Sequence, residues 1–229
     1  EEFGKSRIEF LQKFLPLKKG IPSHDTLGDI FSRLNPSEFE SCFASWVNSL
    51  ATLSEGRVIP IDGKVLKGSK ILGKSAITMV SAWCRTNQMV LGQRKVDGKS
   101  NEITAIPLLL KALDIKGCIV TIDAMGCQRK IAAQIVDQGG DYVFSLKGNQ
   151  GSLQKKVQEC FSHAINNGYK DMVYSSSKSI EKDHGRIESR ECHVLPLMYA
   201  PLLKSKWKGL QSLIKIDSLI EKSEKSYLE

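Results

Sequence analysis

The sequence predicts an α/β fold, namely a mixed five-stranded sheet with flanking helices, preceded by a small helical segment and followed by a β-rich insertion. Two observations lead to this prediction. Three short β-type runs joined by tight turns come first, and such runs favour antiparallel neighbours. Two further apolar runs then alternate with amphipathic helical segments, an order typical of parallel strands joined by helical crossovers.

Residues 1–55 form the predicted helical segment. Apolar residues recur at helical spacing over residues 27–34, and Asn35 and Pro36 then provide the start of a second helix. Residues 39–53 continue it with an apolar stripe of period 3.6. Two short helices of this kind form either a helix-turn-helix that reads DNA or a packed helical hairpin. We favour the packed hairpin.

Residues 56–229 form the second predicted domain, and its elements follow one another in a clear order. The pattern predicts strands at 57–61, 76–83 and 89–96, a helix at 101–113, a strand at 117–122, a helix at 128–138, a strand at 141–146 and a helix at 153–164. Asn101 and Glu102 are interpreted as the helix start that follows the third strand, with Ser100 as its cap. This order places the first strand beside the fourth, an arrangement found in RNase H-like nucleases.

The β-rich insertion begins at about residue 170. Strands are predicted at 172–177, 186–195 and 213–219, with the polar, basic residues 178–185 as the link between the first two.

Composition limits the function classes. Apolar residues make up 41% of the 229 residues, and no apolar run is long enough to cross a bilayer, so we expect a soluble, cytoplasmic protein. Lysine and arginine number 33 against 25 acidic residues, a net charge of +8 that favours a polyanionic partner such as nucleic acid. Six scattered cysteines, none in a C-x-x-C pair, indicate reduced thiols. No phosphate-binding G-x-x-x-x-G-K-[ST] loop is present, which argues against a nucleotide cofactor.

Two aspartates stand at strand ends. Asp62 follows the first predicted strand and Asp123 the fourth, so both carboxylates are expected at one edge of the sheet. Hard divalent ions such as Mg²⁺ take oxygen ligands, which makes this pair a candidate metal site. The alternative is structural, with Asp62 in an Asp-Gly turn and Asp123 as a helix cap. A phosphatase that uses an aspartate nucleophile two residues before Asp62 is set aside, because Pro60 stands there.

Six longer words in order resemble one family. They are GIPSHDT (Gly20–Thr26), IDGK (Ile61–Lys64), KSNEITAIP (Lys99–Pro107), TIDAMGCQ (Thr121–Gln128), LKGNQ (Leu146–Gln150) and DHGRIE (Asp183–Glu188). Together they resemble the ISAs1-type insertion-sequence transposases, which include the H-repeat-associated proteins, within the IS4-like DDE group. The resemblance implies an RNase H-like catalytic domain that binds Mg²⁺ or Mn²⁺ through Asp62 and Asp123. It also implies cleavage and strand transfer at insertion-sequence ends.

The sequence leaves open which residue is the third acidic ligand of such a site. Glu188 is the candidate within the chain, but its strand-like setting resembles the β-rich insertion of these transposases. In the wider group the third acid lies on a helix near the C-terminus, and we expect that part to be missing here. The alternative function is therefore a non-catalytic DNA-binding remnant that lacks the third ligand.

The implied partner is DNA, both the insertion-sequence ends and the target, with a homodimer forming on it. Candidate DNA-binding residues are basic and flank the predicted site: Lys64, Lys67, Lys147, Arg186 and Arg190. Asn149 and Gln150 either add hydrogen bonds to sugar and phosphate or form a simple turn.

Overall fold

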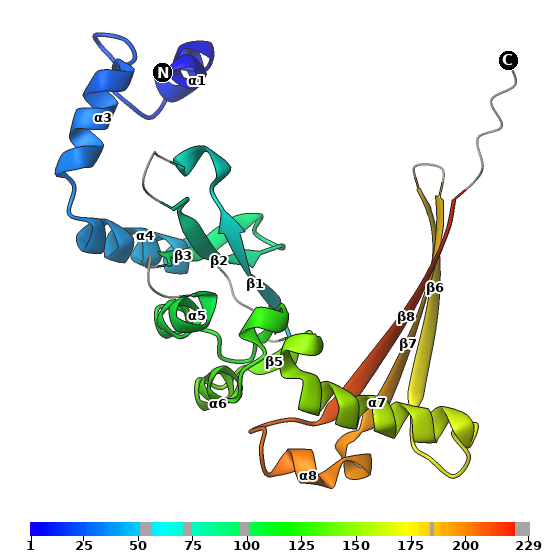
Figure 1. Ribbon diagram of the computed structural model, residues 1–229. Helices are drawn as coiled ribbons and strands as arrows, with labels where there is room; N and C mark the ends of the chain where they lie inside the picture. The colour runs from blue at the N-terminus through cyan, green and yellow to red at the C-terminus, as the bar shows by residue number, and fades with distance from the viewer. Residues whose placement is uncertain (51–55, 71–74, 97–100, 184–185, 223–229) are drawn as a thin grey trace, which may run out of the picture. The chain divides into compact units, whose positions relative to one another are not determined.

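The computed structural model describes residues 1–50, 56–70, 75–96, 101–183 and 186–222 (Figure 1). The chain divides into two compact units, Glu1–Ala51 and Thr52–Glu229, which are described separately. The predicted cap Ser100 lies outside the described residues.

The first unit is helical. Its elements are α1 (Glu2–Ser6), α2 (Ile8–Leu11), α3 (His24–Arg33) and α4 (Pro36–Leu50). Ser23 caps α3 by accepting a hydrogen bond from the amide of Thr26, and the side chain of Asn35 accepts one from the amide of Ser37 at the start of α4.

The packed hairpin predicted for these helices is wrong. Ile30, Phe31 and Trp46 are 50%, 62% and 54% exposed, so the apolar stripes of α3 and α4 do not form a hairpin core. The physical reason lies in the connection, where Leu34 has an extended backbone conformation and Asn35 is restricted by the proline that follows it. Such a link sends α4 off at a corner from α3 instead of folding it back (Figure 1).

The second unit contains a five-stranded sheet of order β3-β2-β1-β4-β5. The β1–β2 and β2–β3 pairs are antiparallel, whereas β1–β4 and β4–β5 are parallel. This confirms the predicted mixed sheet, with the first strand beside the fourth, and it is the RNase H-like arrangement. The strands are β1 (Val58–Val65), β2 (Thr78–Cys84), β3 (Met89–Lys95), β4 (Ile119–Ile122) and β5 (Asp141–Phe144).

Helices flank this sheet because alternate strand residues are apolar. Ile59, Ile61, Val120 and Ile122 are buried, as are the apolar faces of α5 (Glu102–Lys111) and α6 (Arg129–Asp137). α5 lies against β2 and β3, and α6 lies against β5. The approach of α5 is close at Gly92, where a Cβ would lie 3.1 Å from Cδ1 of Leu109.

Three 3₁₀ turns lie between these elements, and a long helix follows them. The turns are η1 (Lys67–Ser69), η2 (Ala124–Gly126) and η3 (Gly148–Gln150), and the helix is α7 (Gly151–Asn166).

The β-rich insertion forms a second, three-stranded antiparallel sheet of order β6-β7-β8. Its elements are β6 (Ser175–Asp183), β7 (Arg186–Pro196), η4 (Leu197–Tyr199), α8 (Pro201–Lys204) and β8 (Ser212–Lys222). Residues 178–183 were predicted as a polar link, but they continue β6. Pairing with β7 explains the difference, since ladder partners such as Lys178 and Glu191 need no apolar alternation.

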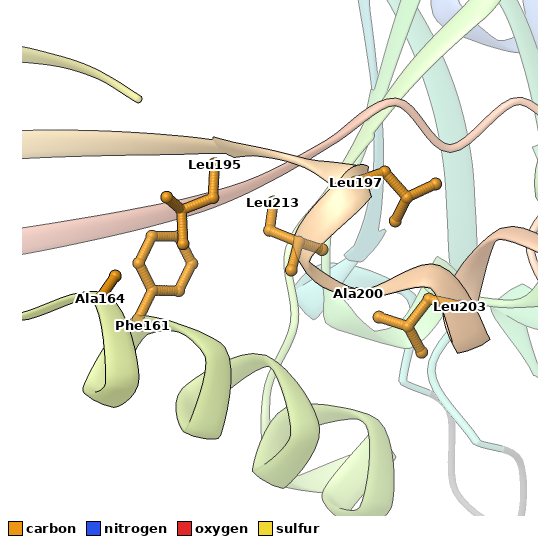
Figure 2. Close-up of a cluster of buried hydrophobic side chains, with 7 residues drawn as sticks. All are labelled: Phe161, Ala164, Leu195, Leu197, Ala200, Leu203 and Leu213. Carbon is orange, nitrogen blue, oxygen red and sulfur yellow. The ribbon is translucent and has the colours of Figure 1, made fainter. Parts of the chain in front are cut away.

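The second sheet is joined to α7 by its own apolar core. Phe161 and Ala164 on α7 pack with Leu195 on β7 and Leu213 on β8 (Figure 2). Leu197 in η4, Ala200 between η4 and α8, and Leu203 in α8 complete the cluster. Among the described helices, none is long and apolar enough to span a membrane.

Candidate functional site

Asp62 and Asp123 lie on neighbouring central strands of the five-stranded sheet, at the C-terminal end of the β1–β4 pairing. β1 and β4 are parallel neighbours in which Ile61 lies opposite Ile122, so Asp62 is the next residue of β1 and Asp123 directly follows β4. The predicted end of the first strand at residue 61 and the alternative Asp-Gly turn are wrong, because pairing of Asp62 with Ser81 on β2 continues β1 to Val65. The two isoleucines are 3% and 4% exposed, and both aspartates are exposed. The two carboxylates are therefore presented to solvent at adjacent positions, directly after the point where the pairing of β1 with β4 stops.

Each aspartate also makes a local contact. Oδ1 of Asp123 accepts a hydrogen bond from the amide of Met125, 3.1 Å away, and so caps η2. This is the structural role considered above, although it engages only one carboxylate oxygen. Nζ of Lys64 lies 3.9 Å from Oδ2 of Asp62, and both side chains are mostly exposed. An exposed pair at that distance contributes little to stability, so Lys64 is free to move toward a ligand.

The segment after β5 is bound to the loop that carries Asp123. The amide of Ser145 donates to the carbonyl of Ile122 at 3.1 Å. Nδ2 of Asn149 donates to the carbonyl of Ala124 at 2.6 Å, and Nε2 of Gln150 donates to the carbonyl of Cys127 at 3.1 Å. Both amide side chains therefore hold the backbone around η2.

Lys147 lies within this same segment. It precedes η3 and its side chain is exposed. Because the segment is fixed to the residues that follow Asp123, Lys147 lies at the same end of the parallel strands as the two aspartates. Lys67, in η1 shortly after β1, is also exposed.

A third carboxylate near the aspartates was missed by the sequence reasoning. Glu102 begins α5, and a Cβ built on Gly63 would lie only 2.1 Å from its Oε1. The carboxyl group therefore lies directly against the β1 backbone, one residue after Asp62. Its pKa is raised from the ordinary value, first by burial and then by the negative charges of Asp123 and Asp62. An acidic residue in the first turn of a helix is common, so the sequence alone gave no signal for this position.

Glu188, the predicted third acid, lies elsewhere. It is in β7 of the second sheet, where Glu181 and Ile220 are its ladder partners. Its Oε1 is 2.9 Å from Nη2 of Arg190, and its side chain is 17% exposed. Arg190 also approaches Glu181 at 3.4 Å, so this predicted DNA-binding arginine is engaged by two acids.

Arg186 begins β7, where its backbone pairs with Asp183. Its side chain lies outside the part of the chain that the structure describes.

The ligand atoms that Asp62 and Asp123 offer fit a hard divalent ion. Asp62 and Asp123 offer carboxylate oxygens, the usual protein ligands of Mg²⁺, and such ions commonly take only one or two carboxylates and keep several waters. Within the described residues, no group of three His, Cys, Asp or Glu side chains is drawn together closely enough to hold an ion. The pair is therefore a partial ligand set.

Comparison with known proteins agrees with this arrangement. Residues 53–197 match the family described as Transposase DDE domain, and residues 1–47 match the segment described as DDE_Tnp_1-associated. The chain belongs to the DDE transposase family. The DDE transposase match covers most of the five-stranded sheet unit, including both aspartates.

Curated relatives place the chain among H-repeat proteins. The H repeat-associated protein YhhI of Escherichia coli strain K12 is 43% identical over 217 residues, which are 93% of this chain and 56% of that protein. YbfD of the same strain, also named H repeat-associated, is 45% identical over 192 residues, 83% of this chain and 75% of that protein. The predicted H-repeat resemblance is confirmed. The chain spans little more than half the length of several relatives, YhhI and YbfL among them.

A solved structure of the piggyBac transposase synaptic complex with hairpin DNA is a distant neighbour. It has a TM-score of 0.34 and 13% identity, and the match covers 60% of this chain and 30% of that one. At this similarity it adds nothing to the family assignment.

Proposed function

We propose that this chain carries the first two catalytic acids and part of the DNA-binding surface of a DDE transposase. The reaction is metal-dependent cleavage of DNA at insertion-sequence ends, followed by strand transfer to a target. The single observation that carries the proposal is the juxtaposition of Asp62 and Asp123 on adjacent parallel strands, where the β1–β4 pairing stops, in a domain that matches the DDE family.

Asp62 and Asp123 hold a divalent ion, Mg²⁺ or Mn²⁺, through their exposed carboxylate oxygens. When bound, such an ion activates a water or a 3′-hydroxyl and stabilises the leaving oxygen. The protein's own contribution is to keep the two carboxylates in place. The buried residues Ile61 and Ile122 fix the backbone that precedes both aspartates, and the hydrogen bonds from Asn149 and Gln150 fix the turn that follows Asp123.

Exposed lysines around this edge bind the DNA backbone. Lys64, Lys67 and Lys147 are solvent-exposed and lie on segments that adjoin β1 and the Asp123 loop. Each phosphate that such a residue neutralises releases a counterion, so affinity rests on charge and falls with salt. Arg190 has a smaller role in this scheme than the sequence suggested, because Glu188 and Glu181 already engage it. We further propose that two copies bind together when two DNA ends are paired.

The test is Mn²⁺-dependent nicking of supercoiled DNA by the purified chain. Asp62→Ala and Asp123→Ala should each abolish nicking. Asp141→Ala is the matched control, because this exposed aspartate begins β5 at the opposite edge of the same parallel strands. Nicking that persists in both site variants, or is lost equally in the control, contradicts the proposed mechanism.

A second candidate function is a DNA-binding remnant without chemistry. The observation that favours it is the engagement of Glu188 by Arg190 in the second sheet, which leaves the aspartate pair without the third acid predicted from sequence. This candidate predicts salt-sensitive DNA binding with no nicking in Mg²⁺ or Mn²⁺. The same assay therefore separates the two functions.

A further inference from the structure

We propose that the outer edge of β8 pairs with β8 of a second copy of this chain, which joins two three-stranded sheets into one continuous sheet. Among the described residues, β8 has β7 on one side and no strand on the other. The inference goes beyond the proposed function, because it concerns a surface on the second sheet and applies to the chain without DNA.

β8 lacks the features that commonly protect an edge strand from pairing. It has 11 residues, Ser212–Lys222, which keep an unbroken register with β7, and it contains no proline or glycine. Alternate residues of an edge strand turn their N–H and C=O groups away from the sheet, so a long, regular edge is a template for another strand. Prolines, bulges and very short strands normally prevent this, and β8 has none of them.

The two edges of this sheet also differ in polarity. β6 consists of serine and charged residues, with Ile180 as its single apolar residue. β8 instead carries four apolar side chains that are 46–62% exposed, namely Ile214, Ile216, Leu219 and Ile220. An exposed, apolar edge favours association, whereas a charged edge opposes it. The edge expected to pair is therefore β8 alone.

A pair formed by β8 with itself limits the assembly to two copies. The same edge is used by both partners across a two-fold axis, and such an isologous contact closes on itself. The polar β6 strands then form the outer edges of the joined sheet. A second copy of this chain is thus the partner that fits this surface, and the expected product is a dimer.

The charges on β8 select one register for the pair. When Ile216 lies opposite its own copy, Lys215 lies opposite the partner's Asp217, and Leu219 lies opposite the partner's Leu213. Residues directly opposite in an antiparallel pair share one face of the sheet, so each lysine meets an aspartate. Centring the pair on Lys215 would place lysine opposite lysine, and centring it on Asp217 would place aspartate opposite aspartate. The Ile216-centred register is the favourable one of the three.

Asp217 also gains from a second positive neighbour. Within the chain it lies opposite Glu191 on β7, and like charges directly opposite one another are destabilising. Its own Lys215 forms an ion pair with it, and both side chains are partly exposed. The partner's Lys215 approaches Asp217 from the free side of β8. Four charges of alternating sign then surround the two-fold axis.

The test is sedimentation velocity of the full chain without DNA over a range of concentrations. The unmodified chain should show a reversible equilibrium of monomer and dimer. Ile216→Lys should raise the dissociation constant by about tenfold or more, because two lysines then meet at the axis. Ile180→Lys is the matched control, since Ile180 is 66% exposed against 62% for Ile216 and lies on the opposite edge strand. It should dimerise as the unmodified chain does.

A mixing experiment tests the register. Lys215→Asp places aspartates opposite one another across the axis, and Asp217→Lys places lysines opposite one another, so each variant alone should be monomeric. An equimolar mixture of the two variants should form a dimer, because every aspartate then faces a lysine. A role of these residues within one chain would give no recovery on mixing.

The outcomes separate the proposal from its alternatives. An unmodified chain that stays monomeric, or that forms species larger than a dimer, overturns it. Equal effects of Ile216→Lys and Ile180→Lys overturn the assignment to β8, and a mixture that stays monomeric overturns the register. If circular dichroism shows that Ile216→Lys does not fold, the mixing experiment decides. The nicking assay tests the aspartate site separately, so failure of either proposal leaves the other standing.

Discussion

The Asn149→Ala variant tests whether the loop after β5 positions Asp123. The substitution removes the hydrogen bond from Nδ2 of Asn149 to the carbonyl of Ala124, 2.6 Å long in the structure. Such a bond contributes about 0.5–1.5 kcal/mol, which for a unit of this size lowers the melting temperature by about 1–6 °C. Ala124 directly follows Asp123, so the loosened turn also displaces the carboxylate.

The expected loss of activity is larger than the loss of stability. A misplacement of about 1 Å at a reacting centre can cost about 10²-fold in rate, so we expect Mn²⁺-dependent nicking to fall at least tenfold. The assay compares nicking rates well below the melting temperature of each variant, so that all chains are folded.

Gln138→Ala is the matched control for this prediction. Its Nε2 donates to the carbonyl of Leu110 at 2.8 Å and joins α6 to α5, remote from the Asp123 turn. It should lose similar stability with nicking nearly unchanged. If both variants lose activity alike, or Asn149→Ala nicks as fast as the unmodified chain, the positioning argument is refuted.

Three further predictions concern the core, charge and DNA binding. Phe161→Ala should lower the free energy of unfolding by about 3–5 kcal/mol, measured in urea, because Phe161 is buried between α7 and the second sheet; a loss below 1 kcal/mol would argue against that packing. The raised pKa of Glu102 means that the folded chain binds this proton more tightly than the unfolded chain does. The contribution of Glu102 to the stability of the metal-free chain should therefore be lost as pH rises through the raised pKa, so the stability of Glu102→Gln relative to the unmodified chain should increase over that range; a constant difference contradicts the assigned cause. Lys147→Gln should reduce the slope of log affinity for DNA against log salt by about one, measured by fluorescence anisotropy, and an unchanged slope would remove Lys147 from the interface.

Much of the second unit could be predicted from the sequence, because its strands and helices have strong local patterns. Alternating or continuous apolar runs located all five strands of the main sheet to within a few residues, and the order of elements fixed the pairing of β1 with β4. The neighbouring positions of Asp62 and Asp123 followed from that pairing, although β1 continues past Asp62 to Val65.

Other features needed the folded chain. The polar stretch 178–183 becomes a strand because β7 supplies its partners, and the exposed faces of α3 and α4 depend on the geometry of their short connection. Local patterns do not encode either effect, since each depends on what lies across from the segment.

The candidate site divides in the same way. The sequence by itself determined the strands and helices of the main sheet and the two acids that lie on its central strands, because those depend on periodicity over a few residues. Only the tertiary structure decided that Glu102 lies on Gly63, that Asn149 holds the Asp123 turn, and that Glu188 is bound by Arg190 in another sheet. The contacts of Glu102 and Asn149 join residues well separated in the chain, and the packing of α5 and η3 on the sheet sets them. The position of Glu188 depends instead on β7, which pairs with β6 and β8 in the second sheet.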